Sequence, residues 1–255
     1  MKKNHGPDID DSADATEAIV RQDPVRKEEY ARQGEFHRNL NPNWSYYPIY
    51  LNKLEVIDNI LNQYQCKTGK ILDAGCGEGV LVEKYAEQGW TITGVDKNYA
   101  SAYVAEGSIT DLPQTDQSID TVLALDVLEH LEYKEQPQAM KELLRVVKPG
   151  GLLIFSCPNL AHFTSRLKLM FRGKLLRTAS EEHHPGDRPY SEYKKLFQEV
   201  GLTIVQSYGI FPTVPPIYRF VMRYPSKSVQ LLKMLRKLPF PIDWHFQIIF
   251  VCRTL

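Results

Sequence analysis

Short hydrophobic runs alternate with amphipathic segments from residue 70 to the end of the chain. The runs have the length of strands and are apolar almost throughout, as strands buried on both faces are. The segments between them carry apolar residues every three or four positions, as helices with one buried face do. This alternation predicts an α/β fold with a mostly parallel sheet and right-handed crossovers. The predicted strands are 70–74, 91–95, 119–125, 152–157, 202–207 and 246–252, and the predicted helices are 79–88, 136–147 and 190–200.

The region before residue 70 has a different pattern. Residues 1–22 are polar and acid-rich, which predicts a disordered tail. Asp23 and Pro24 are typical of a helix start and predict a short helix over 24–33, and apolar spacing predicts a longer helix over 46–64. We therefore expect a helical cap over 23–66 and the main domain over 67–255.

A glycine-rich turn follows the first predicted strand. Gly75, Gly77 and Gly79 alternate after Asp73, and a helix pattern begins immediately afterwards. Such glycines permit positive φ and let a ligand approach the backbone, although a strand-to-helix turn without a ligand remains an alternative. A dinucleotide fingerprint would need glycine at Val80, and Asp73 would repel a pyrophosphate. The acid suits a cationic ligand, such as an amino-acid ammonium or a sulfonium.

Two further acids fall at the ends of predicted strands. Asp96 follows the second strand and Asp126 follows the strand over 119–125. Ligands of open parallel sheets bind outside the carboxyl ends of the strands, so the three acids are expected to lie around one site. The number of residues between Asp73 and Asp96 suits a carboxylate that accepts hydrogen bonds from a ribose diol. This spacing does not distinguish a sulfonium cofactor built on adenosine from a dinucleotide, because both contain an adenosine ribose.

The run 71–81 resembles motif I of the class I S-adenosylmethionine-dependent methyltransferases, of the type 11-like group that includes ubiquinone-type O-methyltransferases. Residues 125–131 resemble the family's D-V-L-E-H motif, residues 108–113 its G-D-x-x-D-L-P segment, and residues 143–158 its L-R-V-L-K-P-G-G segment. The resemblance implies a Rossmann-like, seven-stranded sheet with one antiparallel strand and helices on both faces. It implies S-adenosylmethionine as cofactor and no metal. The implied cofactor contacts are Asp73, Gly75, Cys76, Gly77, Gly79, Asp96, Lys97, Ser108, Ile109, Leu125, Asp126 and His130.

This chain departs from the family pattern in two places. Only a short span separates Asp96 from Asp111, so the usual helix and strand between them must be abbreviated. A long basic insert over 209–243 stands where the family usually has a short hairpin, and it is expected to form a lid or a membrane-surface element.

The chemistry implied by the resemblance is methyl transfer to a small-molecule acceptor, with a hydroxyl oxygen preferred. A protonated hydroxyl needs a base. His183 or His184 is predicted to approach the acceptor and Arg188 to orient it, and a loop pinned by these side chains is the alternative. A glycan or lipid-linked acceptor, or a non-catalytic scaffold that binds S-adenosylmethionine, is also open.

Composition narrows the setting of the protein. The chain has 31 basic and 31 acidic residues, and its four cysteines lack metal-ligand spacing. No signal peptide and no membrane-length apolar run is visible. We expect a cytoplasmic protein, in solution or peripheral to the inner face of the membrane, that does not bind nucleic acid. Two basic amphipathic segments, 166–177 and 219–237, favour contact with a membrane surface or an anionic or lipid-linked substrate.

Overall fold

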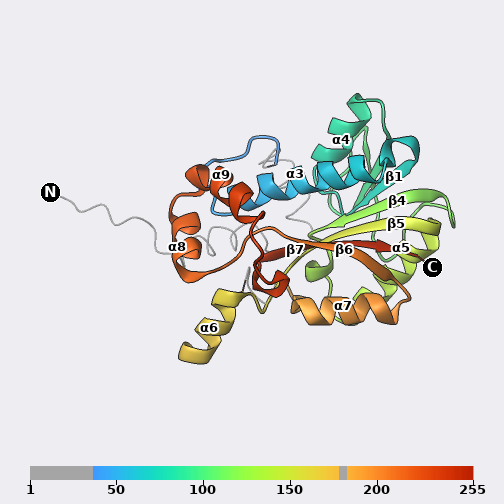
Figure 1. The fold of residues 1–255 in the computed structure, drawn as a ribbon. Coiled ribbons are helices and arrows are strands. Elements are labelled where there is room, and N and C mark those ends of the chain that lie inside the picture. Colours follow the sequence, from blue (N-terminus) through green and yellow to red (C-terminus); the bar gives the residue numbers. More distant parts are fainter. Residues whose placement is uncertain (1–36, 178–182, 255) are drawn as a thin grey trace.

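The computed structural model describes residues 37–177 and 183–254. The predicted tail over 1–22 and the predicted helix over 24–33 lie outside these residues. The described residues form one seven-stranded sheet in the order β3-β2-β1-β4-β5-β7-β6 (Figure 1). The strands are β1 (Lys70–Ala74), β2 (Thr91–Asp96), β3 (Val104–Glu106), β4 (Ile119–Leu125), β5 (Val147–Pro158), β6 (Thr203–Gly209) and β7 (Gln247–Arg253).

Strand direction confirms the predicted architecture. Every pairing is parallel except the two made by β7, which is antiparallel to both β5 and β6. Consequently β1, β2, β4, β5 and β6 all end at the same edge of the sheet. The loops and helices that follow these strands therefore begin at that edge, which we call the carboxyl edge.

Helices cover both faces of the sheet (Figure 1). The helices α5 (Gln136–Val146) and α7 (Tyr190–Glu199) bury apolar side chains in the core on one face. The core on the other face is closed by α3 (Tyr47–Gln63), α4 (Val80–Glu87), α8 (Pro215–Arg223) and α9 (Pro225–Leu235). The helix α6 (Phe163–Arg172) follows β5, and Ser165 is its one buried residue. No helix in the described parts of the chain is long and apolar enough to cross a membrane.

The span between β2 and β3 is abbreviated, as expected. Residues 97–103 form no helix, and β3 has three residues. The prediction for the fifth strand was too short at its start, because 147–151 also takes part in the sheet. Ile119 pairs with Val147, whereas Thr121 pairs with Leu152, so the Lys148-to-Gly151 segment forms an irregularity within β5 instead of preceding it.

The basic insert is anchored on α3. Lys233 of α9 forms an ion pair with Glu55 at 2.8 Å, and Arg236 donates to the Asn52 carbonyl oxygen at 2.9 Å. Asn52 in turn donates to the carbonyl oxygen of Val229 at 3.1 Å. The insert therefore packs on the helix that precedes β1. Its role as a lid stays a prediction.

Candidate active site

The glycine turn between β1 and α4 has the predicted backbone conformation. The φ values of Gly75, Gly77 and Gly79 are 81°, 55° and 69°, in the left-handed region that disfavours side chains. A Cβ on Gly75 would lie 2.5 Å from the Cγ2 atom of Val127, and one on Gly79 would lie 2.4 Å from that of Val104. The turn thus requires glycine both for its conformation and for close packing.

Asp96 is held above this turn by backbone groups. Its Oδ2 atom accepts a hydrogen bond from the Gly77 amide at 2.8 Å, and its Oδ1 atom accepts one from the Asn98 amide at 2.8 Å. A carboxylate has about four acceptor positions, so it retains capacity for further donors such as hydroxyl groups. The end of β2 therefore presents a fixed acceptor beside the glycine turn.

Asp73 is the buried acid of the site. Its side chain is 3% exposed, and its Oδ1 atom has no hydrogen-bond partner among the described residues. Burial, together with the negative charge of Asp96, raises its pKa from 3.8 to about 7, and only Lys53 opposes the shift. A buried carboxylate without a donor is costly, so this position fits a ligand that brings a positively charged donor.

Asp126 anchors a polar network next to Asp73, because β4 pairs directly with β1. Burial opposes its ionisation, but the charge and hydrogen bond of Lys53 outweigh burial and hold the pKa of Asp126 below its ordinary value. Asp126 has a φ of 57°, which turns the chain at the end of β4. Its four hydrogen-bond donors are Lys53 at 2.5 Å, Tyr46 at 3.1 Å, Ser156 and Gln247.

Lys53 was not recognised from the sequence. The side chain is 5% exposed, and its Nζ atom lies 5.0 Å from the ring centroid of Tyr50. A signal was present, because Lys53 falls three or four residues from Ile49, Tyr50 and Ile57 on the apolar stripe of α3. A charged residue in such a stripe is rarely buried unless it is paired.

The predicted histidines meet near the end of β4. The Nδ1 atom of His130 lies 2.9 Å from the His183 carbonyl oxygen, and the rings of His130 and His184 meet edge to face with centroids 4.7 Å apart. Glu129 is buried beside them, its Oε2 atom has no partner among the described residues, and burial and then Asp126 raise its pKa well above the usual value. Glu129, His130 and His184 bring potential metal-ligand atoms within 4.8 Å of one another, a grouping that the sequence did not predict.

Arg188 is held by protein groups. Its Nε atom donates to Gln136 at 2.7 Å, its guanidinium carbon lies 4.6 Å from the ring centroid of Tyr133, and Nη1 lies 3.6 Å from a Glu192 oxygen. These contacts favour the pinned-loop alternative over the predicted role in orienting an acceptor. That role stays a prediction.

The other predicted cofactor contacts surround the turn at different depths. Burial raises the pKa of the Cys76 thiol, and Lys97 is exposed. Ile109 is part of the sheet core, whereas Ser108 is half-buried and hydrogen-bonded to Thr110 at 2.7 Å. Leu125 is half-buried at the end of β4. Their contacts with a cofactor stay predictions.

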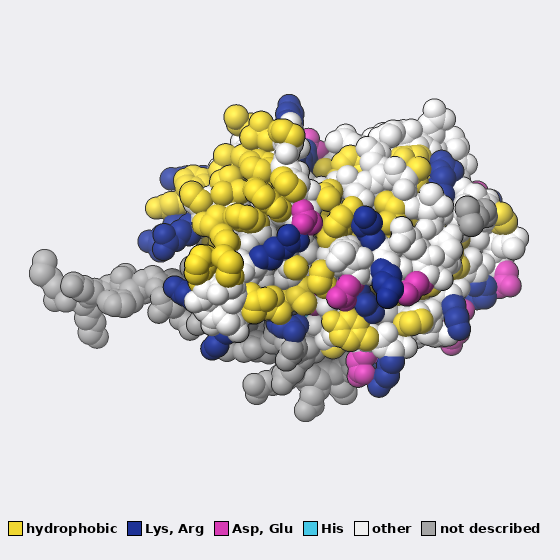
Figure 2. Space-filling model, turned by 60° about the horizontal axis from the view of Figure 1, so that its bottom comes forward, with side chains coloured by type: hydrophobic (Ala, Val, Ile, Leu, Met, Phe, Trp, Pro, Cys, Tyr) yellow, Lys and Arg dark blue, Asp and Glu magenta, His cyan; other side chains and the backbone are white. Residues whose placement is uncertain are grey.

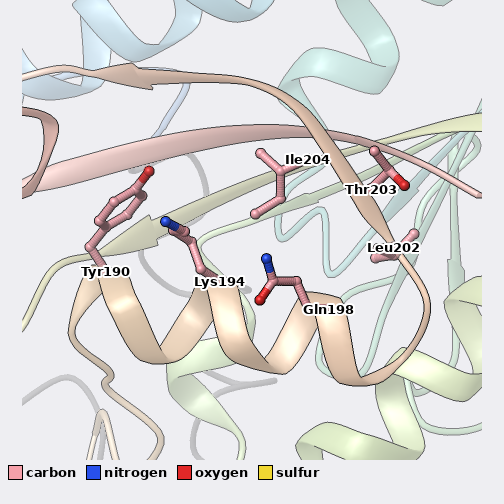
Figure 3. A pocket seen from close by; sticks show the side chains of 6 residues that line it. All are labelled: Tyr190, Lys194, Gln198, Leu202, Thr203 and Ile204. Carbon is pink, nitrogen blue, oxygen red and sulfur yellow. The ribbon is translucent and has the colours of Figure 1, made fainter.

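A separate hollow lies between α7 and β6, at the far end of the sheet order from the glycine turn (Figure 3). It has a volume of about 430 Å³. None of the acids described above lines it. It is bordered by Tyr190, Lys194, Gln198, Leu202, Thr203 and Ile204. We therefore place the candidate active site at the carboxyl edge around Asp73, Asp96 and Asp126.

The fold and this site define an α/β protein with three acids, Asp73, Asp96 and Asp126, at the carboxyl edge of its sheet. Residues 50–207 match the family model described as a methyltransferase domain, which is more than half of the chain. The chain belongs to this family. It is an S-adenosylmethionine-dependent methyltransferase, as the resemblance implied, and S-adenosylmethionine is its cofactor.

Relatives agree with this assignment. The chain is 28% identical over 205 residues to a ubiquinone biosynthesis O-methyltransferase of Coxiella burnetii, covering 73% of this chain and 86% of the relative. It is 27% identical over 158 residues to a probable S-adenosylmethionine-dependent methyltransferase of Mycolicibacterium smegmatis, covering 58% of this chain and only 57% of that relative.

Two solved structures share the fold. A SAM-dependent methyltransferase from Thermotoga maritima has a TM-score of 0.55 and 17% identity, covering 87% of this chain and 98% of that one. The 1,6-didemethyltoxoflavin-N1-methyltransferase of Burkholderia thailandensis, solved with 1,6-didemethyltoxoflavin and S-adenosylhomocysteine, has a TM-score of 0.54 and 14% identity, covering 100% and 93%.

Proposed function

We propose that this enzyme methylates a hydroxyl oxygen of a small-molecule acceptor that binds beside Asp126. The observation that supports this proposal is the ion pair of the buried Lys53 with the half-buried Asp126, which follows β4, the strand beside that of Asp73. The names of the O-methyltransferase relatives point in the same direction.

The residues at the turn fit the cofactor. Asp73 would accept from the methionine ammonium, because its buried Oδ1 atom lacks a donor. Asp96 would accept from the ribose hydroxyls, and the glycines would let the ligand approach the backbone. When bound, S-adenosylmethionine supplies an activated methyl group on a sulfonium.

The pair of Lys53 and Asp126 would prepare the acceptor. A hydroxyl is a weak nucleophile until its proton leaves. Asp126, whose acceptor positions are filled by its four donors, would hold the Lys53 ammonium in place, and that ammonium would stabilise the negative charge that grows on the acceptor oxygen. His183 or His184 stays the predicted proton acceptor. Alignment within a dry pocket can supply as much as about 7–11 kcal/mol.

A lipid-linked acceptor is the second candidate. The basic insert provides the observation that favours it, because α8 follows β6 at the carboxyl edge and exposes Phe220. The labelled methyl-transfer assay described next would also distinguish these candidates from a glycan acceptor and from a non-catalytic scaffold.

The test substitutes Lys53 by Met and by Arg, and follows labelled methyl transfer to catechols, phenols, polyprenylated phenols and glycosides. Lys53→Met should lower turnover by about a hundredfold or more, whereas calorimetric affinity for S-adenosylhomocysteine should change only a few-fold. Lys53→Arg should restore part of the rate. Lys67→Met, on an exposed lysine, serves as the matched control.

Thermal unfolding checks each variant, since Lys53→Met leaves the half-buried Asp126 carboxylate without its cationic partner and should lower stability. Wild-type turnover in a folded Lys53→Met variant would contradict the proposed role. A parallel His184→Ala variant tests the predicted base: its turnover should fall with cofactor affinity retained, and full activity would remove His184 from the mechanism.

A further inference from the structure

Exposed apolar side chains gather on three helices of this enzyme. Seven of the ten large hydrophobic side chains that are exposed in the described residues lie on α6, on α8 and α9, or immediately after them. The most exposed are Phe171 at 77%, Met234 at 68% and Met170 at 66%. The apolar side of α6 is not a core face, because Ser165 is the one residue of that helix that is buried. Figure 1 shows α6 projecting from the body of the molecule.

The same helices carry a concentrated positive charge. Residues 163–177 and 215–238 together hold 11 of the 31 lysines and arginines and none of the 31 aspartates and glutamates. The net charge of the whole chain is zero, so the remainder is correspondingly acidic. Arg172, Lys174, Arg219 and Arg223 form no ion pair with any residue that the structure describes.

These helices lie at the end of the molecule that carries the active site. The strands β5 and β6 are parallel, so α6 and α8, which follow them, start at the carboxyl edge. The Thr164 amide of α6 donates to the Thr213 hydroxyl ahead of α8 at 3.2 Å, which ties the two starts together. In Figure 2 a broad apolar area has lysine and arginine side chains along its border.

We propose that this surface, formed by α6, α8 and α9, docks the enzyme on a bilayer that contains anionic lipid. The arginines and lysines meet the headgroups, and apolar side chains such as Phe171 and Met170 enter the boundary with the acyl chains. A second copy of the chain fits less well, because a two-fold contact would place like charges against each other. Nucleic acid would leave the projecting apolar side chains without a partner. The docking goes beyond the proposed reaction and does not depend on which acceptor is methylated.

Vesicle flotation of the full chain tests the proposal, with phosphatidylcholine alone and with phosphatidylcholine containing phosphatidylglycerol. The wild type should float with the anionic vesicles and only weakly with the neutral ones, and high salt should release much of it. Arg172→Glu/Lys174→Glu should bind about thirtyfold more weakly or worse, because each basic residue near an anionic surface contributes about fivefold. Lys67→Glu/Lys141→Glu is the matched control at two exposed lysines and should bind as the wild type does.

The apolar contribution is tested separately by Phe171→Ser, with Val205→Ser at an exposed position on β6 as control. Phe171→Ser should lose binding and Val205→Ser should not. Circular dichroism and S-adenosylhomocysteine calorimetry, which should not change, verify folding independently of any acceptor.

Several outcomes would overturn the proposal. The first is wild-type protein that floats equally with neutral and anionic vesicles, and the second is wild-type protein that floats with neither. The third is an equal loss of vesicle binding in the Arg172/Lys174 and Lys67/Lys141 variants. A self-association that Phe171→Ser abolishes, seen by analytical ultracentrifugation, would assign the surface to a second copy instead.

Discussion

Replacement of Asp73 by Asn should separate stability from cofactor binding. The folded pKa of Asp73 is about 7 against an ordinary 3.8, chiefly because the carboxyl is buried. The folded state therefore holds the proton more tightly than the unfolded chain, and this favours folding at low pH. That contribution is lost as the pH rises to about 7. Because the folded and ordinary pKa values differ by some three units, the loss amounts to up to about 4 kcal/mol.

Asn does not ionise, so the variant does not lose stability in this way as the pH rises. At pH 8 the ligand-free Asp73→Asn variant should therefore be more stable than the wild type, by up to about 4 kcal/mol in urea unfolding. The same change should weaken S-adenosylhomocysteine binding by about 10- to 150-fold, because a charged hydrogen bond of about 1.5–3 kcal/mol is lost. Asp116→Asn, at an exposed acid, should change neither quantity substantially.

Calorimetry over pH completes this test. Only the ionised Asp73 should accept the ligand's ammonium, so wild-type affinity should fall by about fivefold between pH 7 and pH 6. At pH 6, where most of Asp73 is protonated, binding of the ligand should release about one proton. Asp73→Asn should show neither effect. A pH-independent wild type, or a variant with full affinity, would refute the assignment of Asp73 to a cationic group.

Two further predictions concern folding. Gly75→Ala should destabilise the protein by at least about 1 kcal/mol more than Gly150→Ala, because both glycines have positive φ but only a Cβ at Gly75 would meet Val127. Equal urea midpoints for the two variants would show that Val127 can move aside to accommodate the Cβ. His162 is buried, which lowers its pKa from 6.5 to about 4, so the stability present above pH 6.5 should fall by about 3 kcal/mol as the pH drops to 4. His162→Gln should flatten this slope in unfolding curves, and an unchanged slope would point to other groups.

Local patterns were sufficient to predict the sheet and the conformation of the glycine turn. The bounds of the strand Ile119–Leu125 agree with its apolar run, and the glycine turn has the positive φ values that alternate glycines indicate. Asp73 and Asp96 lie near the ends of neighbouring parallel strands, as predicted, and their contacts with the cofactor stay predictions. In each case the signal lies within a few residues of the chain.

Groups brought together from distant segments could not be predicted in the same way. Lys53 meets Asp126 across 73 positions, and the contact of His130 with His184 depends on how the loop after β5 folds back. The amphipathic pattern of α6 predicted a helix face but could not show whether Phe171 is covered, because a core helix and a surface helix share that pattern. In the structure the Phe171 side chain is exposed.

The central claim is methyl transfer to oxygen at the site of Lys53 and Asp126. Its most direct test incubates the enzyme with S-adenosylmethionine labelled in its methyl group and a total small-molecule and lipid extract, and locates the label by fragmentation mass spectrometry. The predicted result is a labelled O-methyl product that forms about a hundredfold or more slowly with Lys53→Met. A label on nitrogen or carbon, or bound cofactor without any labelled product, would contradict it.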